Sequence, residues 1–238
     1  MKTLLAIDTT TEACSVAIAS EGVIFEKFEI APRLHGELIL QMVDDLLQQA
    51  KLQLRDIDEF IVNCGPGAFT GIRVGISVVQ GLAYAVCKPV IPVNSLQVLA
   101  NGVQLSLKDT VIEGTHIAVA MDARLNEVYW QCFSIKNDFP VEETTAMVSA
   151  VEKVEVPDYG LNAKTCCAGT GWSAYAEKFQ QRFNCHFSVN SNCLYPRASW
   201  AISLANVQSI TAVEAELIMP VYLRDKVAKT TKERNQLR

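Results

Sequence analysis

The sequence predicts an α/β fold with two lobes that share one duplicated plan. The first observation is a repeated pattern, in which an apolar strand ends in an aspartate and a short turn leads into a second strand. The pattern occurs at Thr3–Asp8 and again at Thr115–Ala123, and further strand and helix patterns follow each copy. The second observation is length, since 238 residues can form two small lobes with a substantial core. We expect residues 1–107 to form the first lobe, joined by residues 214–238, and residues 108–213 to form the second.

The first half begins as a meander and continues with alternating helices and strands. Alternating polarity predicts the meander strands, and Glu21-Gly22 predicts a tight turn between two of them. Apolar residues at helical spacing predict an amphipathic helix before the next strand. Asn94-Ser95 is typical of a helix N-terminus. The predicted elements are strands Thr3–Asp8, Ala13–Ser20 and Val23–Ile30, helix Gly36–Ala50, strand Phe60–Cys64, helix Thr70–Val86, strand Val90–Val93 and a helix from Asn94-Ser95 to Leu107.

The second half repeats the hairpin and then becomes harder to assign. The region from Asp138 to Tyr159 mixes strand and helix signals. The remaining predicted elements are strands Thr115–Ala123, Glu127–Ile135 and Thr165–Ala168, helix Trp172–Phe183, strand Cys185–Val189 and helix Ser199–Val207. The duplicated plan fits the actin-like architecture of actin, Hsp70 and the sugar kinases (ASKHA), in which an RNase H-like unit occurs twice and a nucleotide cleft lies between the lobes.

The helix predicted from Thr70 to Val86 is apolar on more than one side. Thr70 is a candidate N-cap. The polar residues form one narrow stripe, which consists of Arg73, Ser77, Gln80 and Tyr84. Two apolar flanks remain, Ile72, Ile76, Val79 and Ala83 on one and Val74, Val78, Leu82 and Ala85 on the other. One flank is expected to lie on the chain's own sheet, and the other requires a second cover, from this chain or from a partner subunit. Gly71 and Gly75 leave room for a second backbone.

Composition excludes several classes of protein. The net charge of −5 is unfavourable for a dedicated nucleic-acid binder acting alone. The sequence has no signal-peptide pattern and no apolar run of about 20 residues, so we expect a cytoplasmic protein with no membrane segment. Six of the eight cysteines, Cys87 among them, fall in apolar strand or helix patterns, which favours reduced thiols. A basic tail from Arg224 onward, with six basic and two acidic residues, is the candidate tRNA contact.

Several residues are candidates for contacts to a nucleotide or another anion. Asp8, Thr9 and Thr10 combine a carboxylate with hydroxyls at the first turn, where the alternative is a turn that caps its own backbone. The second turn reads Asp122-Ala123-Arg124, and the missing glycine weakens the case for ATP chemistry, although Arg124 can pair with an anion. Gly65 and Gly67 precede a helix N-terminus, which can bind anions, although a plain strand-to-helix turn is the simpler interpretation.

No residue pattern predicts a metal site or a nucleophile. His35, His116 and His186 are far apart, with no pair at i, i+4. There is no C-x-x-C motif and no G-x-S-x-G motif. We therefore expect no metal, no cofactor and no catalytic residue.

Five segments, in order, resemble one known family. They are LLAIDTTTEACSVAI, GPGAFTGIRVGISVVQGLAYA, PVNSLQVLA, MDARLNEVYW and PVYLRDKVA, and they span essentially the whole chain. The chain resembles the TsaB (YeaZ) family, accessory proteins in making threonylcarbamoyladenosine next to the tRNA anticodon. The resemblance implies an actin-like fold and a working partner, the catalytic paralogue TsaD. It also implies a ternary complex with the ATPase TsaE, indirect engagement of tRNA, and a homodimer when the chain is alone.

The resemblance also bears on chemistry and on the interface. The catalytic relatives hold a metal through two histidines, and here Ser95 and Leu99 stand at those places, which implies a non-catalytic subunit. The alternatives are an active ATP-binding enzyme of the same fold and a peptidase of the glycoprotease-like family. The family interface implies the helices Gly36–Ala50 and Thr70–Val86. The expected contact residues are Leu38, Met42, Leu46, Gly71, Ile72, Gly75, Ile76, Val79 and Ala83.

Overall fold

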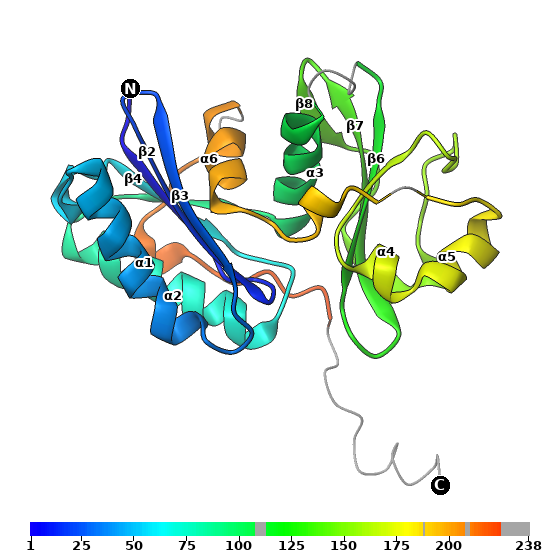
Figure 1. The fold of residues 1–238 in the computed structure, drawn as a ribbon, viewed down its shortest axis with the longest axis horizontal. Coiled ribbons are helices and arrows are strands. Elements are labelled where there is room, and N and C mark those ends of the chain that lie inside the picture. The colour runs from blue at the N-terminus through cyan, green and yellow to red at the C-terminus, as the bar shows by residue number, and fades with distance from the viewer. Residues whose placement is uncertain (108–112, 188, 208–209, 225–238) are drawn as a thin grey trace, which may run out of the picture.

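Two β-sheets and the helices between and outside them make up the fold (Figure 1). The computed structural model describes residues 1–107, 113–187, 189–207 and 210–224. Within these ranges no helix is long and apolar enough to cross a membrane.

The first sheet has the strand order β3-β2-β1-β4-β5. Its strands are β1 (Leu4–Asp8), β2 (Ala13–Ser20), β3 (Val23–Ile30), β4 (Glu59–Asn63) and β5 (Val90–Val93). Strand β1 pairs antiparallel with β2 and parallel with β4, and every residue of β1 is buried. Leu5 and Ile7 face one core cluster while Leu4 and Ala6 face another, as alternation along a strand requires. Burial on both faces explains why β1 reads as a continuous apolar run.

The second sheet repeats this plan, with the order β10-β6-β7-β8 and β9 also paired to β7. Its strands are β6 (His116–Asp122), β7 (Glu127–Lys136), β8 (Phe139–Glu142), β9 (Met147–Ala150) and β10 (Cys166–Ala168). Strands β6 and β7 form an antiparallel hairpin, and β10 runs parallel to β6, as β4 runs parallel to β1. The duplicated two-lobed α/β fold predicted from the sequence is therefore confirmed.

Six α-helices complete the layers within the described ranges. They are α1 (His35–Ala50), α2 (Phe69–Ala85), α3 (Ser95–Ser106), α4 (Gly171–Ala174), α5 (Ala176–Phe183) and α6 (Ala198–Val207). Short 3₁₀ turns are η1 (Leu54–Asp56), η2 (Val151–Lys153), η3 (Ser191–Cys193) and η4 (Ala215–Leu217). Helices α1 and α2 lie side by side on the outer face of the first sheet, and α4 and α5 cover the outer face of the second (Figure 1).

Helices α3 and α6 occupy the middle layer and are exchanged between the lobes. Helix α3 packs on β6, β7, β8 and β10 of the second sheet, whereas α6 packs on strands of the first. The two helices also pack on each other, and Gly102 lies against the indole of Trp200. By packing, α3 belongs with the second sheet and α6 with the first. The expected boundaries at residues 107 and 213 instead place each helix with the strands that precede it in the chain.

The C-terminal strap, residues 213–222, packs on the first sheet and on α2. Val213 pairs with Val90 at the edge of the first sheet. The Gln80 side chain of α2 donates hydrogen bonds to the carbonyls of Ala215 and Ile218, at 3.0 and 3.4 Å. The Val221 amide donates to the carbonyl of Cys64 at 2.8 Å. The strap therefore lies along one side of α2.

Four local expectations need correction. Thr70 is not the N-cap of α2, because the helix already begins at Phe69 and Ala68 holds the cap position. The predicted helix Trp172–Phe183 is broken at Tyr175, whose φ of −128° is not helical. The strand expected at Cys185–Val189 is reduced to one bridge between Val189 and Cys167, with residue 188 outside the described ranges. Cys87 is exposed and lies just after α2. The basic tail beyond Arg224 also lies outside the described residues.

Candidate functional site

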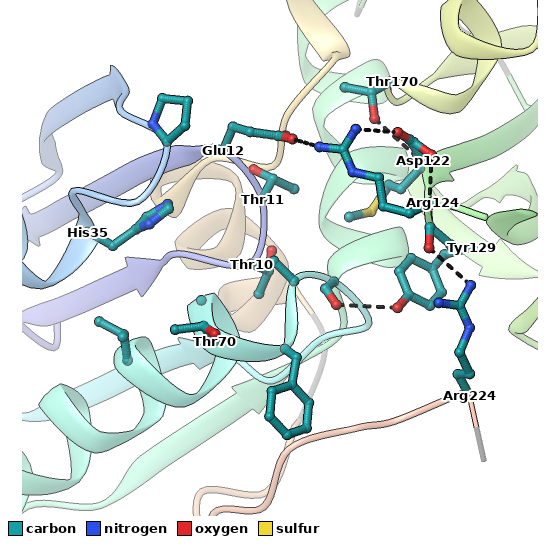
Figure 2. Close-up of a pocket in the computed structure, with 18 of the residues that line it drawn as sticks. Thr10, Thr11, Glu12, His35, Thr70, Asp122, Arg124, Tyr129, Thr170 and Arg224 are labelled. Carbon is teal, nitrogen blue, oxygen red and sulfur yellow. Dashed lines mark hydrogen bonds and ion pairs between the residues drawn. The ribbon is translucent and has the colours of Figure 1, made fainter. Parts of the chain in front are cut away.

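A cleft of about 980 Å³ lies between the two lobes. The first turn, the start of α2, the β6–β7 turn and the end of the C-terminal strap form its walls (Figure 2). The cleft occupies the position where the actin-like architecture predicts a nucleotide. Of the six candidate anion contacts, only Thr10, Gly67 and Arg124 line it.

Asp8 is not a cleft residue, contrary to its expected role as an anion or nucleotide contact. Its side chain is buried, with 1% of its surface exposed. It accepts hydrogen bonds from the Thr10 amide and hydroxyl, both at 2.9 Å, and from the Asn63 amide group. Burial raises the pKa of Asp8 from 3.8 to about 6, although the hydrogen bonds oppose the shift. Asp8 therefore serves to fix the first turn to β4.

Thr9, Gly65 and Gly67 also make contacts within the chain. The Thr9 hydroxyl is buried and donates to the carbonyl of Gly71 at 2.7 Å. A Cβ at Gly67 would lie 2.2 Å from the carbonyl oxygen of Thr10, and one at Gly65 would meet Ile72. These glycines are needed for close packing of backbone against backbone, so the structure gives them a role as turn residues, the simpler of the two interpretations.

Arg124 projects from the tip of the β6–β7 hairpin into the cleft. Its guanidinium lies between Glu12 of the first lobe, at 2.5 Å, and Asp122, at 3.0 Å, as Figure 2 shows. Arg124, Leu125 and Asn126 all have φ between 55° and 63°, a conformation that costs non-glycine residues about 1–2 kcal/mol each. Arg124 is thus paired with carboxylates of its own chain, so an anion that enters the cleft must compete with Glu12 and Asp122.

Sequence reasoning missed several residues that line the cleft. The Tyr129 hydroxyl donates to the carbonyl of Gly67 at 3.3 Å, which links the lobes, and Arg224 donates to the carbonyl of Ala123 at 3.0 Å (Figure 2). Arg33 and His35 line the opposite wall. A long-range contact such as that between Tyr129 and Gly67 carries no local sequence signal. Arg224 stood out only as the first residue of the basic tail.

The Gly169-Thr170-Gly171 loop packs against the end of β6. A Cβ at Gly169 would lie 2.3 Å from the carbonyl oxygen of Ala120. The Thr170 hydroxyl accepts a hydrogen bond from the Asp122 amide at 3.1 Å and faces the cleft. The glycines therefore allow the loop to approach the sheet.

Ser95 and Leu99, which stand where the resemblance implies metal-binding histidines in the catalytic relatives, are used in the core of this chain. The Ser95 hydroxyl is fully buried and donates to the Asn63 side chain at 2.8 Å, and Leu99 lies in the central core cluster. In the part of the chain that the structure describes, no three His, Cys, Asp or Glu side chains group as metal ligands would.

The expected interface residues on α1 and α2 face the chain's own core. Leu38 is half-buried, and eight residues are buried, namely Met42, Leu46, Gly71, Ile72, Gly75, Ile76, Val79 and Ala83. A Cβ at Gly71 would lie 2.0 Å from the Thr9 carbonyl oxygen, and one at Gly75 would lie 2.5 Å from the Thr9 hydroxyl. Gly71 therefore admits the backbone of the first turn, and Gly75 admits the Thr9 side chain. This correction settles which flank of α2 lies on the sheet.

The outer face of α2 carries small and apolar groups. Thr70, Ser77 and Gly81 are exposed, and a Cβ at Gly81 would meet nothing within 4 Å. Phe69 is 54% exposed and Tyr84 is 75% exposed. Val74, Val78 and Leu82 are half-buried beside them. On α1, Leu40 is also exposed. The polar stripe of α2 therefore faces solvent, and exposed or half-buried apolar side chains lie on both sides of it.

Comparisons with known proteins show the family to which the chain belongs. The family model described as "TsaD: tRNA N6-adenosine threonylcarbamoyltransferase" matches residues 22–232. The protein named "tRNA threonylcarbamoyladenosine biosynthesis protein TsaB" from Haemophilus influenzae is 34% identical, with 94% of each chain covered. Its namesake from Escherichia coli is 35% identical over 94% of this chain and 96% of the other. The solved structure "YeaZ from Pseudomonas aeruginosa" is 40% identical, with a TM-score of 0.81 over 94% of this chain and 100% of that one. The chain belongs to the TsaB (YeaZ) family of tRNA threonylcarbamoyladenosine biosynthesis proteins.

Proposed function

We propose that this chain is a non-catalytic subunit in the synthesis of threonylcarbamoyladenosine in tRNA. In this proposal it binds the paralogue TsaD through the outer faces of α1 and α2 and holds TsaD in an active conformation. The ATPase TsaE joins in a ternary complex, and tRNA is engaged through the assembly. The observation that carries the proposal is the outer face of α2, where exposed small residues lie between exposed and half-buried apolar ones.

The cleft supports the non-catalytic part of the proposal. The Asp8 carboxylate is buried, accepts three hydrogen bonds from its own chain and does not line the cleft. Arg124 is paired with Glu12 and Asp122. Transfer of the threonylcarbamoyl group is therefore assigned to TsaD, and this chain contributes binding and rigidity.

An ATP-binding enzyme is the second candidate, because the cleft is large enough for a nucleotide and three arginines line it. Calorimetry with ATP tests it directly. Micromolar affinity that is lost in the Arg124→Ala variant favours the enzyme, and no heat of binding at millimolar ATP favours the scaffold.

Blocking the outer face of α2 tests the proposed interface. We expect Ser77→Tyr to abolish TsaD binding in sedimentation or calorimetry, because the ring stands where a partner helix would approach. The same variant should make a self-paired homodimer monomeric. Ser173→Tyr, at an exposed serine of α4 in the second lobe, is the matched control and should bind normally.

The same variants give a functional readout. Modification of tRNA by TsaD and TsaE, supplied with threonylcarbamoyl adenylate as donor, should fail with Ser77→Tyr and proceed with Ser173→Tyr. Wild-type affinity of Ser77→Tyr for TsaD would refute the interface. Modification of tRNA by this chain without TsaD would refute the non-catalytic assignment.

A further inference from the structure

Arg73 is the only charged residue in α2, and the structure holds it in one place. Its guanidinium carbon lies 3.4 Å from the centre of the Phe69 ring and 5.2 Å from the centre of the Tyr222 ring. The two rings are themselves stacked, with centres 5.5 Å apart and an angle of 27° between their planes. The arginine is thus supported by the preceding turn of α2 and by the C-terminal strap.

The charge of Arg73 has no carboxylate partner among the described residues. None of the ion pairs found in those ranges includes Arg73, and the side chain is exposed. By contrast, Arg124, Arg197 and Arg224 are each paired with a glutamate. A guanidinium held by stacked rings loses little further rotamer freedom when it binds, and its planar donors fit a carboxylate with two parallel hydrogen bonds.

Arg73 lies beside a groove with several apolar lining residues. A shallow groove of about 380 Å³ runs along the helix beside it, lined by Phe69, Thr70, Arg73, Val74, Ser77 and Val78. Tyr222 of the strap is 42% exposed and stacks on Phe69, so it extends this surface. An arginine and aromatic rings beside such a groove match the composition of binding hot spots.

We propose that Arg73, packed over the Phe69 ring and beside the Tyr222 ring, binds a carboxylate side chain on a helix of the partner protein that lies in the α2 groove. The inference rests on the proposed function and names the chemistry of that contact. It also makes the C-terminal strap part of the interface, because Tyr222 supplies one of the two rings.

A protein carboxylate fits this surface better than a nucleic-acid phosphate. The tail from Arg224 contributes +4 to a total charge of −5, which leaves −9 for residues 1–223. A single arginine in an acidic body does not create the positive field that phosphate backbones require. The groove next to Arg73 is walled by valine and phenylalanine side chains, which suit the apolar residues that flank a charge on a partner helix.

Charge reversal with a matched control tests the proposal. We expect Arg73→Glu to weaken TsaD binding about tenfold or more, as judged by calorimetry with the full chains. Arg73→Lys keeps the charge but not the planar fork, so it should lose part of that affinity. Arg55→Glu makes the same charge change at an exposed residue of η1 with no ion pair among those found in the described ranges, and it should bind as the wild type does. Thermal melts verify that each variant is folded.

A rescue experiment identifies the carboxylate. Acidic residues on the helices of TsaD are changed singly to arginine, and one of these variants should restore affinity for Arg73→Glu. If Arg73→Glu and Arg55→Glu bind equally well while Ser77→Tyr does not bind, the carboxylate contact is wrong and the interface stands. If Ser77→Tyr also binds, the proposed interface itself is wrong. If Arg73→Glu loses affinity for tRNA but not for TsaD, the arginine contacts phosphate and the proposal fails.

Discussion

The two faces of α2 differ in what their glycines contact. On the inner face, Thr9 occupies the space beside Gly71 and Gly75. A Cβ at Gly71 would lie 2.0 Å from the Thr9 carbonyl oxygen, and one at Gly75 would lie 2.5 Å from the Thr9 hydroxyl. On the outer face, Gly81 has nothing within 4 Å of a hypothetical Cβ. The same residue type thus brings the chain's own first turn close on one side and leaves an unobstructed surface on the other. The difference teaches that a small residue on an apolar helix does not by itself say which neighbour it admits.

The difference also explains how one helix can serve both the fold and a partner. The inner face locks the first turn against the sheet, through the bond from the Thr9 hydroxyl to the Gly71 carbonyl. In this turn Asp8 and Thr9 are used in packing, whereas Thr10 also lines the cleft. The outer face makes none of these contacts, which leaves it free for the partner contact proposed above.

The strongest test of the difference between the two faces of α2 is to place a glutamate on each face in turn. Ile76 is 5% exposed, and Ser77, its neighbour, is exposed. We expect Ile76→Glu to cost more than about 4 kcal/mol of unfolding free energy, because it buries an unpaired charge. Ser77→Glu should change stability by less than about 0.5 kcal/mol. Urea denaturation of both variants measures this. Equal stabilities would mean that α2 does not lie on the sheet as described.

The second largest expected effect is the pH dependence of stability that comes from the buried Asp8. The pKa of Asp8 is about 6 in the folded protein against an ordinary 3.8, because burial disfavours its charge. The folded state therefore holds this proton more tightly, so stability from Asp8 is present below pH 4 and is lost as the pH rises to 6. The loss amounts to about 3 kcal/mol.

Comparison with Asp8→Asn isolates this titration. The free energy of unfolding of the wild type should fall relative to that of Asp8→Asn between pH 4 and pH 7, as measured by urea denaturation at each pH. Parallel curves for the two proteins would show that Asp8 ionises in the folded state as it does in the unfolded chain.

The sequence predicted the fold well where local patterns determine it. The period-2 strands and the Asn94 cap are examples, since the Asn94 side chain does accept the Leu96 and Gln97 amides. The exchange of α3 and α6 was not predicted, because both helices are buried widely and their sequences do not say which sheet they cover. The duplicated hairpin was visible because both copies end a strand in aspartate.

The candidate site was predicted less well, for a physical reason. Periodicity located two apolar flanks on α2 but could not distinguish them, because either one could lie on a sheet. Asp8 looked like a ligand because it combines a carboxylate with neighbouring hydroxyls at a turn. Its bonds to Thr10 are local and match the alternative of a self-capping turn, but its bond to Asn63 depends on a strand 55 residues away. Family resemblance supplied the pair of helices in the proposed interface, and three-dimensional packing was needed to separate their inner residues from their outer ones.

The smallest effect compares alanine at the two kinds of glycine. Gly71→Ala places a methyl group 2.0 Å from the Thr9 carbonyl oxygen, so the first turn must move, and we expect a loss of about 2 kcal/mol. Gly81→Ala meets open space in the middle of a helix, where alanine is favoured over glycine by about 1 kcal/mol, so the variant should be slightly more stable. Thermal melts of the two variants should therefore shift in opposite directions. Stabilisation by both substitutions would mean that Thr9 does not pack on α2, and destabilisation by both would mean that the outer face of α2 is already covered within the chain.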